Sequence, residues 1–441
     1  MAVNKNQKLK LNIIDMNNDG YGIAKVDGEV VFVPYTLPGE EVEATIINTK
    51  NKFAIAKADR IISASAHRVE AKCPYFGKCG GCSLQHLSYE KQLEFKTKLV
   101  KDTLKKFGNI DADVLPCVAS PQWRYRNKNA LPANGSLGMY RKNSHNVIEI
   151  EDCLIAQKWF PTLLKVVKDF IKKYDISLYD EEKKSGLIKH LVTRSLNNQI
   201  LITIVINGES LPHSDMLIKD LSRCFKNFGL NLNINTLNSN VIFSNKWKYI
   251  YGLKELPDCS NGIEYSISNA SFMQINDSIK SSIYDKILSL IDNNDTVIDA
   301  YSGAGLLSAM ISKKAKSCYG IEVIPQTTAN ANELARKNNL SNLTNINGDC
   351  AVELPKLIQD LKDETTVVLD PPRKGCDKRV IDAISGSKPN KIIYLSCSPD
   401  TLARDLKNLL TTTKYNIQFV QPYDMFPNTP HVETLAYLIK E

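Results

Sequence analysis

The stretch Thr296-Val297-Ile298-Asp299-Ala300-Tyr301-Ser302-Gly303-Ala304-Gly305 decides the fold, because an apolar run here ends in a glycine-rich turn. The run predicts a buried strand, and residues 306–313 after the turn predict a helix. A second strand pattern, at residues 317–323, carries Glu322 near its end. A strand, a glycine-rich turn, a helix and a strand-end acid form the order that holds a ribose diol on a doubly wound sheet. Because the turn lacks the third glycine of dinucleotide sites, it favours an adenosyl group without phosphates.

Two more strand patterns bring reactive side chains to the same expected edge of the sheet. Residues 365–369 precede Asp370 and a Pro-Pro loop, and residues 391–395 precede Cys397. Open α/β sheets bind their ligands outside the carboxyl ends of the strands, so Asp370 and Cys397 are expected there. Glu433, expected on a later loop, adds a base to this nucleophile.

Three strings then identify a family by resemblance. Asp370-Pro-Pro-Arg-Lys-Gly, Ser396-Cys-Ser-Pro and Met425-Phe-Pro-Asn-Thr-Pro-His-Val-Glu433-Thr resemble the motifs of the RNA (uracil-5-)-methyltransferase family in wording, order and spacing. Members of that family transfer a methyl group from S-adenosylmethionine to carbon 5 of a uridine. The resemblance implies that Cys397 is the nucleophile and Glu433 the proton acceptor. It further implies cofactor-binding roles for Gln274, Tyr301, Glu322 and Asp370, and a contact of Phe272 with the target base.

The chemistry of these residue types agrees with that reaction. Carbon 5 of uracil is a weak nucleophile, and a thiolate that adds to carbon 6 activates it, which is covalent catalysis. A carboxylate must then remove the proton from carbon 5. The target uridine has to leave its stack to be reached. Alternatives remain: Cys397 as an ordinary core cysteine, Glu433 as a solvated loop acid, Phe272 as core, and Cys376 as a rival nucleophile.

A cysteine cluster, Cys73-Pro-Tyr-Phe-Gly-Lys-Cys79-Gly-Gly-Cys82, lies far upstream of these motifs. The chain has 11 cysteines, an odd number, and this close spacing favours metal ligands over disulfides. The family resemblance implies that Cys153 is the fourth ligand and that the set holds a [4Fe–4S] cluster. Four thiolates also suit zinc, which stays an alternative.

The N-terminal 63 residues predict a small β-barrel, because turn pairs such as Asp27-Gly28 and Pro38-Gly39 separate short apolar runs. The segment resembles a TRAM domain, an RNA-binding barrel of the oligonucleotide-binding type. We therefore expect a multidomain chain: a TRAM β-barrel at 1–63, a central α+β iron–sulfur and RNA-binding domain at 64–266, and a Rossmann-like α/β methyltransferase domain at 267–441. In the central part, residues 186–194 and 200–206 predict paired strands.

Charge and composition indicate an RNA partner. The net charge is +8, and residues 64–130 hold twelve Lys and Arg against six Asp and Glu, which suits a phosphate backbone. Within this segment, residues 122–128 interleave aromatic and basic side chains, as a base-stacking surface does. No apolar run reaches the length of a membrane span, so we expect a cytoplasmic protein without a membrane partner. We also expect a monomer.

The expected substrate follows from the accessory features. A TRAM domain together with four cysteines resembles the branch of the family that acts on 23S ribosomal RNA. The tRNA branch shares the methyltransferase half and is the alternative. A non-catalytic RNA-binding iron–sulfur protein is an alternative of another class, against which the presence of both Cys397 and Glu433 argues.

Overall fold

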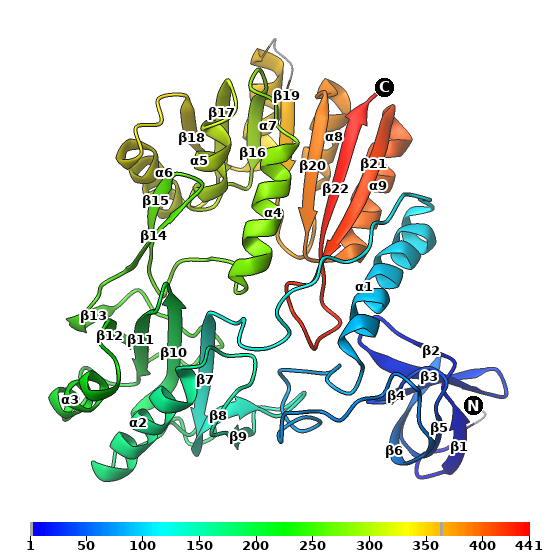
Figure 1. Cartoon of the computed structure of the whole chain (residues 1–441), viewed down its shortest axis with the longest axis vertical. Coiled ribbons are helices and arrows are strands. Elements are labelled where there is room, and N and C mark those ends of the chain that lie inside the picture. The colour runs from blue at the N-terminus through cyan, green and yellow to red at the C-terminus, as the bar shows by residue number, and fades with distance from the viewer. Residues whose placement is uncertain (1–2, 362–364) are drawn as a thin grey trace.

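The computed structural model describes residues 3–361 and 365–441 and contains three sheet-based parts (Figure 1). The N-terminal part is a six-stranded sheet in the order β1-β5-β6-β4-β3-β2. Its strands are β1 (Lys8–Asn12), β2 (Asp15–Met16), β3 (Tyr21–Val26), β4 (Glu29–Pro34), β5 (Glu41–Lys50) and β6 (Phe53–Ser63). Asp27 and Gly28 join β3 to β4 with positive φ at both residues, as a type I′ hairpin turn requires. The predicted turn at this dipeptide is confirmed.

The central part is a seven-stranded sheet in the order β13-β12-β11-β10-β7-β8-β9. Two helices cover one face, since the apolar stripes of α2 and α3 bury Leu163, Val167 and Leu217 against it. The predicted pairing within this part is confirmed, because β10 and β11 are antiparallel neighbours. The elements are β7 (Lys128–Asn134), β8 (Ser136–Tyr140), β9 (Val147–Glu149), α2 (Phe160–Lys173), β10 (Ile188–Leu196), β11 (Gln199–Ile206), α3 (Ser214–Cys224), β12 (Phe228–Ile234) and β13 (Trp247–Gly252).

The C-terminal part is the predicted doubly wound sheet, in the order β18-β17-β16-β19-β20-β22-β21. The first five strands are parallel, and β22 runs antiparallel to both of its neighbours. A hairpin of β14 (Leu256–Ser260) and β15 (Ile263–Ile267) precedes it. Its elements are α4 (Asp277–Ser289), β16 (Thr296–Ala300), α5 (Leu306–Ser312), β17 (Ser317–Glu322), α6 (Pro325–Lys337), β18 (Leu343–Asn347), α7 (Cys350–Asp360), β19 (Thr365–Leu369), α8 (Lys378–Ser387), β20 (Lys391–Ser396), α9 (Pro399–Thr412), β21 (Tyr415–Tyr423) and β22 (Glu433–Lys440).

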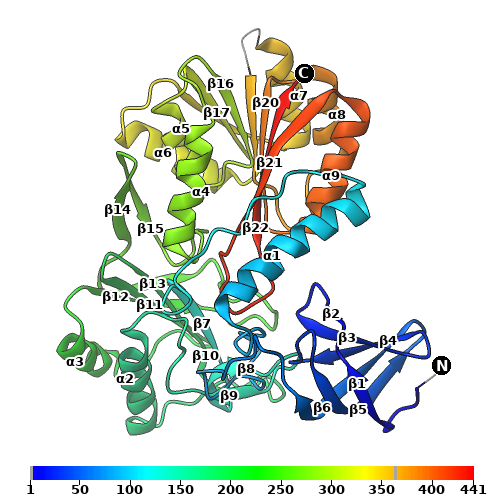
Figure 2. The same ribbon diagram turned by 45° about the vertical axis from the view of Figure 1, so that its right-hand side comes forward.

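One helix that precedes the central sheet in the sequence packs on this C-terminal part, as the turned view of Figure 2 shows. Helix α1 (Tyr89–Thr103) continues into a π-helical turn, η1 (Leu104–Gly108), and Val100 and Leu104 enter the same core as Leu406 of α9. Val118 then forms a parallel bridge to Tyr423. The boundaries at 63 and 266 stay predictions, and residues 89–118 pack on the part that follows the second of them.

The helices within residues 3–361 and 365–441 include none with both the length and the hydropathy of a membrane span.

Candidate active site and cysteine cluster

A cavity of about 570 Å³ lies at the carboxyl edge of the C-terminal sheet. Such a volume is in the usual range for small-molecule sites. Its walls come from the residues that end or follow β16, β17 and β19, together with the segment before α4. All five residues that the sequence predicts for the cofactor and the target base line it: Phe272, Gln274, Tyr301, Glu322 and Asp370.

The glycine-rich turn shapes one wall of this cavity. Gly303 and Gly305 have φ values of 53° and 79°, a left-handed conformation that glycine adopts without strain. A Cβ on Gly305 would lie 2.7 Å from Cβ of Ala331 on α6, so the close helix–turn approach also needs glycine. The Gly303 N–H donates to Oε2 of Glu322 at 3.1 Å, and the Ile324 N–H donates to Oε1 at 2.8 Å. The Glu322 carboxylate is thereby held in place and keeps acceptor capacity for a ligand.

Tyr301 and Phe272 have opposite environments. Burial raises the pKa of the Tyr301 phenol, and the nearby thiols of Cys376 and Cys350 add to the shift. The phenol therefore lies in the protein next to these two cysteines and is screened from water. Phe272 is 83% exposed, which makes the core alternative for this residue wrong. An exposed ring at a cavity mouth is free to stack on a planar ligand.

Cys397 and Glu433 lie at the same edge of two neighbouring strands. Ser396 pairs with Thr434 in the antiparallel register of β20 and β22, and Cys397 and Glu433 are the next residues toward the edge. Glu433 is 3% exposed and is the first residue of β22, so it is neither on a loop nor solvated, and both expectations were wrong. Cys397 is half-buried, unlike an ordinary core cysteine.

Burial dominates the titration of this edge. It raises the pKa of Glu433 to about 8, with Asp370 adding to the shift and Arg373 opposing it. It also raises the pKa of Cys397, with Glu433 adding to the shift and Arg373 opposing it. The pKa of Asp370 rises to about 7 through burial and through Asp299. The edge is therefore a set of coupled acidic groups with one nearby guanidinium.

Sequence reasoning did not single out Asp299, which also lines the cavity. Burial raises its pKa to about 6, and the Ser308 hydroxyl donates to its Oδ2 at 2.5 Å. A signal was present in the sequence, because Asp299 is the one charged residue in the otherwise apolar run of β16. Buried carboxyls with raised pKa values mark functional sites.

The rival nucleophile Cys376 is more enclosed than Cys397. It is 7% exposed, and its N–H donates to Oδ2 of Asp405 at 2.9 Å. The Tyr394 hydroxyl donates to the same oxygen at 2.7 Å. Burial raises the pKa of the Cys376 thiol to about 12. The thiol is thus enclosed and protonated, whereas Cys397 is half-buried.

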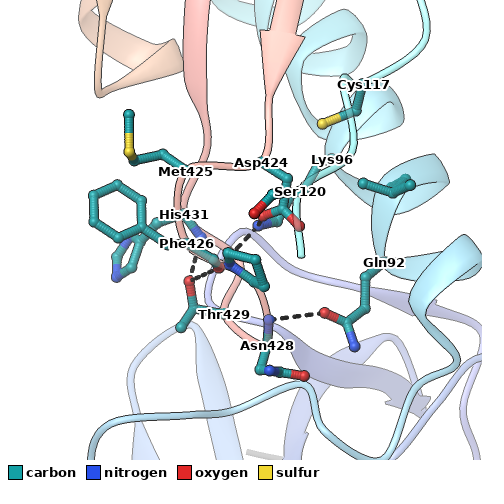
Figure 3. Close-up of polar contacts among 12 residues, drawn as sticks. Gln92, Lys96, Cys117, Ser120, Asp424, Met425, Phe426, Asn428, Thr429 and His431 are labelled. Carbon is teal, nitrogen blue, oxygen red and sulfur yellow. Dashed lines mark hydrogen bonds and ion pairs between the residues drawn. The ribbon is translucent and has the colours of Figure 1, made fainter. Parts of the chain in front are cut away.

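Helix α1 holds the loop 424–432, which leads into Glu433 (Figure 3). Lys96 forms an ion pair with Asp424 in which both side chains are fully buried, and its Nζ also donates to the Phe426 carbonyl at 3.1 Å. The Asn428 N–H donates to Oε1 of Gln92 at 2.9 Å. The approach to Glu433 is therefore fixed by a helix more than 300 residues earlier in the chain.

Residues 122–128, expected to stack RNA bases, are largely occupied by internal contacts. Tyr125 is buried, and its hydroxyl donates to the Pro427 carbonyl at 3.3 Å. Arg124 pairs with Asp152 through two nitrogens. These contacts connect residues 122–128 to the loop 424–432 and to Asp152, the neighbour of Cys153.

The four predicted ligand cysteines line one pocket of the central part: Cys73, Cys79, Cys82 and Cys153. Burial raises the pKa of Cys82 to about 12, and it also raises those of Cys79 and Cys153, with neighbouring thiols adding to each shift. In residues 3–361 and 365–441, no three His, Cys, Asp or Glu side chains are close enough to hold a single metal ion. Four thiols that line one pocket are a donor set suited to an iron–sulfur cluster, and the same set suits zinc.

Two family models match the chain. The one described as tRNA (Uracil-5-)-methyltransferase matches residues 88–441, which begin at α1. The one described as the TRAM domain of tRNA (uracil(54)-C(5))-methyltransferase matches residues 9–66. The expected TRAM domain is confirmed.

Relatives and a solved structure agree over nearly the full length. An uncharacterized RNA methyltransferase of Halalkalibacterium halodurans is 38% identical over 448 aligned residues, covering 99% of this chain and 98% of its own. One from Listeria monocytogenes is 38% identical, with 98% of each chain covered. The structure of Pyrococcus abyssi tRNA (uracil-54, C5)-methyltransferase with S-adenosyl-L-homocysteine has a TM-score of 0.79 at 24% identity, covering 98% of this chain and 100% of that one. It shares the fold. With the predicted strings and these matches together, the chain belongs to the RNA (uracil-5-)-methyltransferase family.

Proposed function

We propose that this protein methylates carbon 5 of a uridine in 23S ribosomal RNA, with S-adenosylmethionine as the methyl donor. The observation that carries the proposal is the register of β20 and β22, which brings Cys397 and Glu433 to the edge where Asp370 lines the cavity. A nucleophile, a base and a cofactor-sized cavity are the three parts that the family reaction needs.

The residues around the cavity fit the methyl donor. Glu322 would accept hydrogen bonds from the ribose hydroxyls, since backbone N–H groups already hold its carboxylate. Gln274 and Asp370 would contact the amino-acid and sulfonium end, and the Tyr301 backbone carries the turn. When bound, S-adenosylmethionine supplies a sulfonium methyl group that carbon 5 attacks, leaving S-adenosylhomocysteine.

The chain's own residues perform the other steps. The half-buried Cys397 thiol gives its proton to solvent, and the thiolate adds to carbon 6, so that the electrons of the double bond between carbons 5 and 6 make carbon 5 nucleophilic. After methylation, the Glu433 carboxylate takes the proton from carbon 5. The electrons of the broken bond between carbon 5 and hydrogen restore the double bond between carbons 5 and 6, and the thiolate leaves carbon 6. Phe272, exposed at the cavity mouth, would stack on the flipped uracil.

The raised pKa values suit these roles. A carboxylate with a pKa of about 8 is a stronger base than an ordinary glutamate, and it can remove a carbon-bound proton. Arg373 opposes the rise at both Cys397 and Glu433, so it favours the charged form of each at the moment it acts.

We also propose that Cys73, Cys79, Cys82 and Cys153 hold a [4Fe–4S] cluster with a structural role. The pocket that these four thiols share supports this proposal. Methyl transfer from a sulfonium consumes no electron. The cluster would therefore tie residues 73–85 to residues 150–155, in addition to the hydrogen bond from the Glu151 N–H to the Tyr75 hydroxyl at 3.0 Å.

The choice of 23S ribosomal RNA rests on the joint presence of the TRAM domain and the four cysteines. A second candidate is tRNA, because both matching family models are described by tRNA substrates. Purified protein with labelled S-adenosylmethionine should methylate transcribed 23S fragments and leave tRNA transcripts unlabelled. The reverse preference would replace the first substrate with the second.

Trapping the covalent adduct tests the mechanism. The Glu433→Gln variant should add and methylate but fail to release, so a labelled protein–RNA adduct should survive denaturing electrophoresis. In the Glu433→Gln background, adding Cys397→Ala should abolish the adduct, and adding Cys376→Ala is the matched control that should keep it. An adduct that persists in Cys397→Ala and disappears in Cys376→Ala would move the nucleophile to Cys376. An absence of methylation on any RNA would favour the non-catalytic RNA-binding iron–sulfur protein.

A further inference from the structure

An exposed row of aromatic side chains marks the edge strand β13. Trp247, Tyr249 and Tyr251 are 40%, 48% and 42% exposed, although large apolar residues are usually covered. Strand β13 has β12 as its sheet neighbour and is the outermost strand on that side. Lysines on an edge strand guard against aggregation, but that function has no need of three exposed rings.

Two of the three rings lie on the sheet face away from α2 and α3, whereas Tyr251 pairs with Leu230 and its ring centroid is 5.2 Å from that of Phe228 on the helix-covered side. Tyr249 pairs with Asn231 and Trp247 with Asn233, whereas Leu230 and Leu232 of the same strand enter the helix-covered core. Successive residues of a strand point to opposite faces. Trp247 and Tyr249 therefore share the face opposite the helices, and a bulge near Tyr251 follows them.

Two sets of contacts connect this face to residues 269–272, the segment that carries Phe272. Asn231 pairs with Thr203, and the Asn269 side chain donates to the Thr203 hydroxyl at 2.6 Å, three residues before Phe272. In the second set, the ring centroid of Phe243 lies 4.9 Å from that of Trp247.

Phe243 in turn lies beneath a lysine that reaches the same loop. Lys128 Nζ is 5.8 Å from the Phe243 ring centroid and donates to the Asn269 carbonyl at 3.3 Å. Contacts through Phe243, Lys128 and Asn269 thus link the aromatic row to the segment that carries Phe272.

The chain segment that carries the row is basic, up to Glu255, which follows it. From Cys224 to Lys254 the chain holds four lysines and no Asp or Glu. Lys254 Nζ lies 5.2 Å from the ring centroid of Tyr249, whose hydroxyl donates to the Gly252 carbonyl at 2.8 Å, so this ring is ordered before any partner binds. Protein–protein interfaces are depleted in lysine, whereas aromatic rings between lysines are typical of surfaces for unpaired nucleic acid.

We propose that the β13 edge is a stacking platform for unpaired bases next to the target uridine. The inference rests on the proposed function, because a flipped uridine leaves its neighbours unstacked and in need of new partners. Trp247 and Tyr249 would stack on the bases, and Lys246, Lys248 and Lys254 would neutralise phosphates.

Binding of a 23S hairpin transcript to the full chain tests the platform. Trp247→Leu and Tyr249→Leu should each raise the Kd about tenfold or more, whereas Trp247→Phe and Tyr249→Phe should stay near the unmutated value, because a ring is kept. Val352→Ala, which removes an exposed side chain on α7, is the matched control and should change nothing. The KM for RNA should rise with the Kd while kcat at saturating RNA is kept.

A second probe reports stacking itself. A 2-aminopurine beside the target uridine should be quenched by the unmutated protein and not by Trp247→Leu. Unchanged Kd and quenching in the leucine variants would overturn the platform, even if methylation is normal. Self-association that the leucine variants abolish, with RNA affinity kept, would assign the surface to a second copy instead. If no RNA is methylated but binding still depends on both rings, the platform stands and the proposed reaction fails.

Discussion

Replacing Lys96 with methionine tests whether the buried pair with Asp424 secures the loop that leads into Glu433. Methionine keeps the apolar stem of lysine and removes its charge, so Asp424 is left buried with Tyr89 as a remaining donor, at 2.8 Å. The Phe426 carbonyl also loses the bond from Lys96 Nζ. That carbonyl still accepts from the Thr429 hydroxyl and the Thr429 N–H, so the loss is mainly the uncompensated charge of Asp424.

The expected cost is about 3–5 kcal/mol, the range found when one partner of a fully buried ion pair is removed. With a urea m-value of about 2 kcal/mol per molar, the unfolding midpoint of the C-terminal part should fall by roughly 1.5–2.5 M. Asp424→Asn in the Lys96→Met background should recover most of this, because the amide carries no charge and still accepts from Tyr89.

Urea titration of the three variants, read by the hydrogen exchange of the C-terminal part, measures the effect, because all three tryptophans lie outside that part. Lys98→Met is the matched control on the same helix, since its ion pairs with Asp15 and Asp102 are exposed and should contribute little. If Lys96→Met shifts the midpoint no more than Lys98→Met, or if the double variant is as unstable as the single one, the buried pair does not secure the loop.

Three further predictions address the cofactor, the cluster and the titrating base. Glu322→Ala should weaken S-adenosylmethionine binding by about one to two orders of magnitude in calorimetry, because a charged hydrogen bond contributes roughly 1.5–3 kcal/mol; equal affinity would contradict the placement of the ribose. Anaerobically purified protein should be brown, and Cys79→Ser should remove the visible absorbance, whereas a colourless protein with equimolar zinc would exclude the cluster. Glu433 has a folded pKa of about 8, above its ordinary 4.5, so its proton stabilises the fold below pH 4.5 and that contribution is lost as the pH rises through 8. Glu433→Gln should therefore gain most stability over the unmutated protein above pH 8, and a constant difference across pH in urea titrations would refute the buried-acid assignment.

The local features of this protein follow from the sequence alone. The strands at β16, β17, β19 and β20 are confirmed within one or two residues, because apolar runs of this length, followed by a glycine turn or a proline, leave few other conformations. The Asp27-Gly28 turn is confirmed for a similar reason, since both residues tolerate positive φ. The three family strings consist of adjacent residues, so they indicate the family without any knowledge of the tertiary structure. The roles given to individual site residues stay predictions.

Other features depend on contacts between distant residues, and the sequence carries no local signal for them. Helix α1 reads as part of the central region, and only packing against α9 and β21 brings Lys96 to Asp424. The burial that raises the pKa of Glu433 comes from the whole sheet edge, and a loop placement was the natural but incorrect expectation. The exposed row on β13 was not recognised at all, because an aromatic strand pattern is the same for a core and for a surface. Burial is a property of the assembled fold, and so tertiary structure decided both the titration of the buried acids and the exposure of the β13 rings.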